Sequence, residues 1–286
     1  MELSFSLNYL MRDSRGNHLR DIADTVPFVS GAGFRYVDYS PDFKSDGWES
    51  AARRDREILD KAGITVEQTH APFNRYETHP SDLFPTYVMR LFEASKILGA
   101  KYVVVHADEY RTVDRYDEKE ILDFTYDYLA PYVEYAAKNG LVVAVENVFD
   151  DAHWPYIDGK SRFTSRIEEL KAVIERFNSP VLQCCWDFGH AKCAFGQEKM
   201  AEALGEVGKY VVCTHVHDNY YGKDLHLVPF LGETDWNENM AALKSAGYTG
   251  KLSFEFVYGI IPDNILPFWM DYVFKTGKTL DSLFEK

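Results

Sequence analysis

The chain alternates short apolar runs with longer stretches in which apolar residues recur at every third or fourth position. Most of the short runs are apolar on consecutive positions, as strands covered by helices on both faces should be. The eight runs are Leu3–Leu7, Tyr36–Tyr39, Thr65–Gln68, Tyr102–Val105, Leu141–Val145, Val181–Trp186, Val211–Thr214 and Lys251–Phe254. Helical periodicity marks Pro80–Leu98, Glu118–Lys138 and Ser165–Phe177.

Glycine and asparagine mark the points where predicted helices end. They occur in Lys61-Ala-Gly63, Leu98-Gly99-Ala100, Lys138-Asn-Gly140 and Ser245-Ala-Gly247, each shortly before a predicted strand. Thr164-Ser165 followed by Glu168 resembles a capping box at the start of a helix.

The spacing of these elements predicts the fold class. Eight strand–helix units in 286 residues leave about 36 residues per unit, which is typical of a (β/α)8 TIM barrel. We therefore predict one α/β domain that spans residues 1–286. A doubly wound open sheet is the structural alternative, but the string Gly31-Ala-Gly33 precedes a strand instead of following one.

Composition and charge narrow the class further. The formal net charge is −14, which opposes non-specific binding to nucleic acid. The apolar runs are far shorter than the roughly 20 residues that span a bilayer, and the N-terminal residues lack the pattern of a signal peptide.

The four cysteines form no CxxC pair, so we expect reduced, buried thiols in a cytoplasmic protein and no thiolate zinc site. The apolar stretch Ile260–Phe268 fits either packing or a homo-oligomer interface, so the oligomeric state stays open.

Histidines and carboxylates gather where the predicted strands end. His70, His106, Glu146, Asp187, His215 and Glu255 end or follow six successive runs, and His190, His217, Asp224 and His226 lie shortly beyond. The carboxyl ends of barrel strands form one rim, where chemistry collects. Carboxylates held close together either shift their pKa values strongly or bind a cation. Imidazole mixed with carboxylate favours Zn²⁺ or Mn²⁺ over Ca²⁺ or Mg²⁺, so we predict a divalent-metal site.

One string carries a resemblance to a known superfamily. Thr214-His-Val-His-Asp-Asn219, followed by Lys223-Asp-Leu-His226 and Gly232-Glu-Thr-Asp-Trp236, resembles a segment common in xylose-isomerase-like TIM barrels. The resemblance covers nearly the whole chain. This superfamily holds sugar phosphate isomerases and epimerases together with endonuclease-IV-type AP endonucleases.

The resemblance implies a ligand set and roles for its members. Epimerases of this kind hold their metal with a Glu–Asp–His–Glu set, which matches Glu146, Asp187, His215 and Glu255. The two glutamates would also be the catalytic acid/base pair, and His190 would contact the substrate. The endonuclease-type members hold three zinc ions, and their further ligands match His70, His106, His190, Asp224 and His226. The expected number of ions is therefore one to three.

The composition of the predicted rim favours a small sugar over DNA. Loops 107–117, 147–162, 191–197 and 219–230 contain six basic and eight acidic residues, without the basic stripe that duplex DNA requires. No glycine-rich phosphate loop is apparent, and Lys192 and Lys223 are the nearest cations. Aromatic residues are abundant instead, which suits a sugar stacked on rings.

We therefore predict a divalent-metal-dependent sugar or sugar phosphate isomerase or epimerase that works by proton transfer through a metal-stabilised enediolate. Glu146 and Glu255 would remove and return the proton. The predicted substrate contacts are His190, His217, Phe73 and Trp154. The alternatives are a zinc-dependent phosphodiesterase similar to the AP endonucleases and a barrel that binds a ligand without turning it over.

Overall fold

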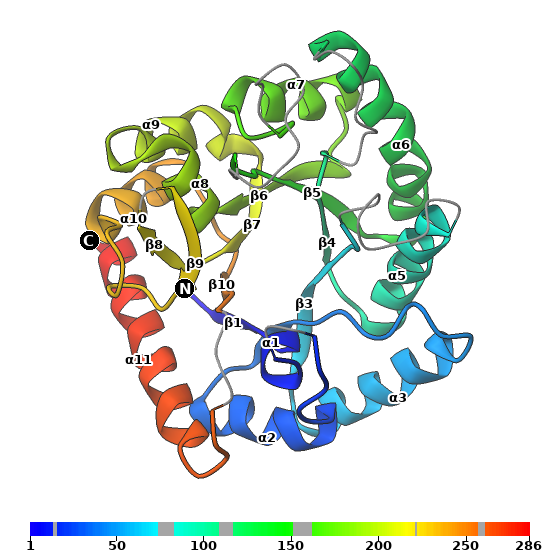
Figure 1. Cartoon of the computed structure of the whole chain (residues 1–286), viewed down its shortest axis with the longest axis vertical. Helices are drawn as coiled ribbons and strands as arrows, with labels where there is room; N and C mark the ends of the chain where they lie inside the picture. Colours follow the sequence, from blue (N-terminus) through cyan, green and yellow to red (C-terminus); the bar gives the residue numbers. More distant parts are fainter. Residues whose placement is uncertain (14–15, 74–82, 109–116, 151–161, 221, 257–260) are drawn as a thin grey trace.

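The computed structural model describes residues 1–13, 16–73, 83–108, 117–150, 162–220, 222–256 and 261–286. Within this part of the chain, eight parallel strands form a single barrel with helices around it (Figure 1). The barrel strands are β1 (Leu3–Ser6), β2 (Tyr36–Asp38), β3 (Thr65–His70), β4 (Tyr102–Val105), β5 (Val142–Glu146), β6 (Leu182–Asp187), β7 (Val211–His215) and β10 (Leu252–Phe254). The predicted single-domain (β/α)8 barrel is confirmed.

The strand order is β10-β1-β2-β3-β4-β5-β6-β7, so from β1 to β7 each barrel strand pairs with the next one along the chain, and the last strand, β10, pairs with the first. Between β7 and β10 the ring closes through Val216. Its N–H donates to the carbonyl of Ser253 at 2.7 Å, and its carbonyl accepts from the N–H of Glu255 at 3.2 Å. This closure brings the residue after β10 next to the end of β7.

The described helices are α1 (Asn8–Met11), α2 (Ile22–Ala32), α3 (Trp48–Lys61), α5 (Phe84–Leu98), α6 (Glu118–Asn139), α7 (Ile167–Phe177), α8 (Phe188–Phe195), α9 (Gln197–Val207), the 3-10 turn η1 (Gly208–Tyr210), α10 (Trp236–Ser245) and α11 (Leu266–Glu285). Most of them surround the barrel, whereas α1 and α8 lie inside this ring and directly follow the ends of β1 and β6 (Figure 1). Helices α5 and α6 end at Gly99 and Gly140, whose φ angles of 73° and 72° are left-handed and favour glycine, as predicted. The capping box was predicted with the wrong glutamate. Glu169, and not Glu168, accepts the backbone N–H of Thr164, at 2.9 Å.

The strands are apolar on both faces because each face meets a different core. Val103 and Val105 of β4 pack in the main core with the surrounding helices. Tyr102 and Val104 alternate with them and pack with Cys185 and Cys213 inside the barrel. All four cysteines are buried and free, which confirms the prediction of buried thiols.

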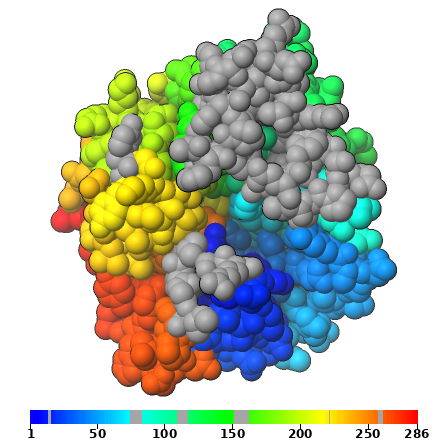
Figure 2. Space-filling view, in the orientation of Figure 1, coloured from blue at the N-terminus to red at the C-terminus, as the bar shows by residue number. Residues whose placement is uncertain are grey.

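One element of the rim was not predicted from the sequence. An antiparallel hairpin of β8 (Asp218–Tyr220) and β9 (Lys223–Leu227) lies between β7 and α10. In Figure 2 this hairpin (yellow) and the N-terminal segment (dark blue) both border the middle of the visible face. The hairpin therefore brings its own side chains to the rim beside the strand ends.

No described helix combines the length and the hydrophobicity that a membrane-spanning segment requires.

Candidate metal centre

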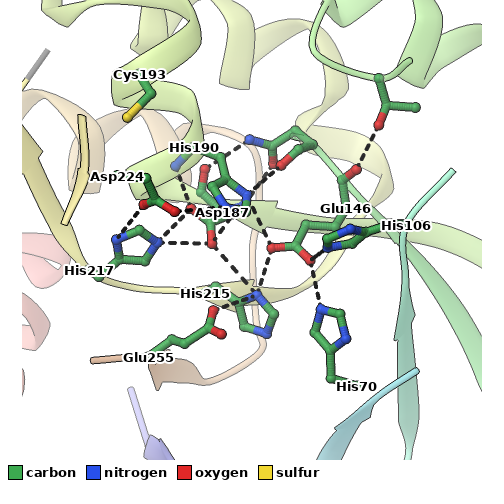
Figure 3. Close-up of polar contacts among 12 residues, drawn as sticks. His70, His106, Glu146, Asp187, His190, Cys193, His215, His217, Asp224 and Glu255 are labelled. Atoms are coloured by element: carbon green, nitrogen blue, oxygen red, sulfur yellow. Dashed lines mark hydrogen bonds and ion pairs between the residues drawn. The ribbon is translucent and has the colours of Figure 1, made fainter. Parts of the chain in front are cut away.

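The residues predicted as metal ligands converge at the carboxyl ends of the barrel strands (Figure 3). His70, Glu146, Asp187 and His215 are the last residues of β3, β5, β6 and β7. In each of three groups the ligand atoms all lie within 4.8 Å of one another, and two of the groups share Glu146 and His215. The three groups are Glu146, Asp187, His215 and Glu255; His70, Glu146 and His215; and His190, His217, Asp224 and His226.

Glu146 lies at the centre of the cluster. Its Oε2 is 3.1 Å from Nε2 of both His70 and His106, and its Oε1 is 2.8 Å from Nδ1 of His215. Burial disfavours the ionised carboxyl, but the charge of His215 and the hydrogen bond from His106 hold the pKa of Glu146 well below its usual range. Glu146 is thus a buried carboxylate surrounded by imidazoles, as a ligand shared between two ions would be.

Asp187, His215 and Glu255 complete the first group, which we call the bracket. Nδ1 of His215 is 3.2 Å from Oε2 of Glu255 and 3.7 Å from Oδ2 of Asp187. Burial opposes ionisation of Glu255, yet the adjacent imidazoles lower its pKa to about 2. The Tyr9 hydroxyl donates to Oε1 of Glu255 at 2.7 Å and fixes the orientation of this carboxylate.

The third group, which we call the outer group, joins α8 to the hairpin. Oδ2 of Asp224 is 3.1 Å from Nε2 of His226 and 3.7 Å from Nε2 of His190. His217 is fully buried, with Nε2 3.1 Å from Asp187. Burial disfavours the charged form of His226, but Asp224 raises its pKa to about 9.

The chemistry of these donors fits divalent zinc or manganese. Every ligand atom is an imidazole nitrogen or a carboxylate oxygen, the mixture that suits these ions. In the described part of the chain, Nδ1 of His217 is buried without a hydrogen-bond partner although it faces Asp224 at 3.8 Å. A buried imidazole nitrogen is costly without a partner, and a cation in the outer group would supply one.

A cavity of about 230 Å³ opens over this cluster. Of the predicted substrate contacts, Phe73 and His190 line it, and Phe73 is 42% exposed and stacks on His106 with ring centroids 4.8 Å apart. His217 is fully buried, and Trp154 lies outside the described residues. Tyr9, His70, Phe73 and Glu255 also line an adjoining cavity of about 390 Å³. The two spaces therefore meet beside the bracket.

Two basic residues of the predicted rim, Lys192 and Arg162, form hydrogen bonds with other residues of the protein. Lys192 is buried, and its Nζ donates to the carbonyl of Glu233 at 3.0 Å. Nε of Arg162 donates to Oδ2 of Asp108 at 2.6 Å. Both residues were counted as rim charges in the sequence, but these bonds hold their cationic groups within the protein.

The sequence reasoning missed three residues that support the cluster. Asp38, the last residue of β2, lies 3.2 Å from Nε2 of His215. Asn219 donates to Asp224 at 3.0 Å and accepts the N–H of His226 at 3.1 Å. Tyr9 bonds to Glu255. The prediction considered only the ends of the third to eighth strands. A search for polar residues at the ends of the first two strands would have found Asp38.

Comparison with known proteins finds the same fold. An uncharacterized protein of Sinorhizobium fredii is 24% identical over 265 residues, covering 82% of this chain and 80% of that protein. Two solved structures share the fold. A D-tagatose 3-epimerase-like protein has a TM-score of 0.73 at 21% identity and covers 100% of this chain and 97% of its own. D-psicose 3-epimerase from Clostridium cellulolyticum H10, solved with D-tagatose, has a TM-score of 0.73 at 14% identity and covers 98% and 99%.

The family comparison covers most of the barrel. Residues 26–266 match the family described as xylose isomerase-like TIM barrels, a span that runs from α2 to the start of α11 and holds every predicted ligand. The chain therefore belongs to the family of xylose isomerase-like TIM barrels.

Proposed function

We propose that this protein is a divalent-metal-dependent isomerase or epimerase of a sugar or sugar phosphate. One observation carries the proposal: Glu146 and Glu255 approach the same atom, Nδ1 of His215, at 2.8 and 3.2 Å, beneath a cavity lined by aromatic rings. Two carboxylates on one metal bracket can hold an ion and also move a proton. The names of the two solved structures, both 3-epimerases or 3-epimerase-like, support a ketose as the substrate.

Proton transfer is assigned to the two glutamates. When bound, a divalent ion would polarise the sugar carbonyl and stabilise the negative charge that develops as the adjacent carbon loses its proton. Glu255 is the more accessible of the pair, with a side chain 13% exposed against 1% for Glu146. Glu255 removes or returns a proton at one face of that carbon, and Glu146 serves the other face. Tyr9 keeps the Glu255 carboxylate in its orientation.

The cavity walls supply binding and orientation. Phe73 and Phe149 offer ring faces to the apolar side of a sugar. His190 lies in the same wall, where it can contact a substrate oxygen. The rings also exclude water from the space above the glutamates, which strengthens electrostatic interactions there.

Substitution of each glutamate tests this assignment. Glu255→Gln and Glu146→Gln should lower turnover by at least 10²-fold, the usual contribution of a positioned proton-transfer group. Glu67→Gln is the matched control, because Glu67 is also buried and its carboxylate instead pairs with Lys251 Nζ at 2.8 Å. Turnover is measured on a panel of ketoses, aldoses and their phosphates with the metal-loaded proteins. Wild-type turnover by either site variant would contradict the acid/base assignment.

A second candidate function is hydrolysis of a phosphodiester with several zinc ions. The outer group favours it, since His190, His217, Asp224 and His226 could hold an ion beyond the bracket. Metal-loaded protein would then cleave a duplex that contains an abasic site, and a chelator would stop the cleavage. The engagement of Lys192 and Arg162 by protein groups weighs against a DNA substrate.

A further inference from the structure

A neutral imidazole can bind a metal through one nitrogen only while the other carries the proton, so each ligand histidine needs a partner that fixes its tautomer. Three histidines of the cluster use Nδ1 on a backbone carbonyl, which leaves Nε2 for the carboxylates. These bonds run from His70 to Ala71 at 2.8 Å, from His190 to Asn147 at 2.9 Å and from His226 to Glu255 at 3.1 Å. Because these acceptors are backbone carbonyls, no side-chain substitution removes them.

His215 is oriented the other way round. Its Nδ1 faces the bracket, as described above, and its Nε2 lies 3.2 Å from Oδ2 of Asp38. Gln68 donates its Nε2 to the same oxygen at 3.0 Å and thereby holds the carboxylate in place. All three side chains are buried, so water does not compete for these bonds.

We propose that Asp38 is a positioning residue that makes Nδ1 of His215 the metal-binding nitrogen. The carboxylate accepts the proton of Nε2, fixes the ring in the bracket and increases the basicity of Nδ1. This inference rests on the metal site of the proposed function, but it does not depend on which reaction follows.

Alanine at this position separates this role from a purely structural one. Asparagine would not, because Gln68 and Nε2 of His215 meet the same oxygen of Asp38, and a single amide oxygen could accept from both. Asp38→Ala removes that acceptor, so the ring is no longer held with its proton on Nε2 and can adopt the tautomer with the proton on Nδ1. That tautomer cannot bind a metal through Nδ1.

The test measures zinc affinity by competition with a chromophoric chelator, on full-length protein freed of metal and titrated with zinc alone. We expect Asp38→Ala to bind zinc about 10- to 100-fold more weakly, the usual effect of removing such a partner. Asp55→Ala is the matched control, since Asp55 is equally buried but accepts from Tyr39 at 2.7 Å on the α3 side of β2. It should bind zinc as the wild type does. An affinity for Asp38→Ala within twofold of that control would overturn the inference.

A second measurement uses the wild type and so does not depend on the variant folding. Histidine ¹⁵N NMR of the zinc-loaded protein should show the proton of His215 on Nε2 and zinc on Nδ1. A proton on Nδ1 would overturn the inference, and a wild type that binds no zinc would overturn both the inference and the metal site. Zinc binding without any turnover of sugars would count against the proposed function alone.

Discussion

His217 and His226 lie face to face, with ring centroids 3.9 Å apart and ring planes 5° apart. Both imidazoles face Asp224, which comes from the same hairpin as His226. The outer group therefore exists only while the hairpin is held against the end of β7. The carboxylate of Asp218 holds it there, since this one side chain accepts four N–H groups. The donors are the backbone of Asn219, Phe230 and Thr234 and the indole of Trp236, at 2.9 to 3.1 Å.

Asp218→Asn should destabilise the protein and loosen the outer group. An amide can accept at one oxygen only, so buried donors lose their partner at roughly 1–3 kcal/mol each. Chemical unfolding measures the loss in free energy, and zinc titration measures the loss of outer-group binding. The control is Asp271→Asn, where the carboxylate is 55% exposed and pairs only with Lys275 among the described contacts. Equal stability of the two variants would contradict this role for Asp218.

Gly189→Ala should displace His217. Gly189 lies in α8, and a methyl group there would overlap the imidazole ring of His217, which is buried and has no space to retreat. Overpacking of this kind costs about 1–3 kcal/mol. At Gly205, in α9, an added methyl group would meet no atom within 4 Å, so Gly205→Ala should be neutral or stabilising by up to about 1 kcal/mol. The melting temperatures of the two variants provide the comparison, and a Gly189→Ala protein as stable as Gly205→Ala would show that the ring can move.

Metal should stabilise the folded protein. The bracket and the outer group gather Glu146, Asp187, Asp224 and Glu255 in a small buried volume, and only the folded chain holds them together. A ligand at 100 times its Kd adds about 2.7 kcal/mol to the free energy of unfolding. Melting curves of chelator-treated protein with and without added zinc or manganese measure this effect. Identical curves would be incompatible with a metal site in this cluster.

The cysteine thiols should resist alkylation in the native protein. Burial raises the pKa of Cys193 to about 12, and it raises the pKa values of Cys184 and Cys185 well above the usual range. Since the thiolate is the reactive form, little of it exists below such a pKa. Thiol titration at pH 8 should find no reactive cysteine until denaturant is added. Reaction of Cys184 in the native state would contradict its burial inside the barrel wall.

The barrel was predictable because its signals are local. Each strand is buried on both faces and therefore reads as an apolar run, and glycines such as Gly99 and Gly140 mark the helix ends. The strand-end positions then placed Glu146, Asp187 and His215 on one rim. The hairpin was not predictable in this way, because β8 has only three residues and, in β9, the half-buried Asp224 and His226 are polar while Leu225 between them is exposed.

The residues that hold the ligand side chains in place were harder to predict, because they lie far from those ligands in the sequence. Asp38 and His215 are 177 positions apart, and an aspartate at the end of one strand does not reveal which imidazole it will meet. The carbonyls that fix His70, His190 and His226 carry no side-chain signature at all. Roles of this kind depend on how the strands close into a ring.

The most direct test of the account is solvent proton exchange into a sugar. Metal-loaded protein is incubated in D₂O with ketohexoses, including D-tagatose, and with their phosphates, and the products are analysed by NMR. We expect deuterium at the carbon beside the carbonyl together with a change of configuration or carbonyl position. Both should be lost with chelator and in Glu255→Gln. If a folded and metal-loaded protein exchanges deuterium into none of these sugars, the proposed proton transfer is contradicted.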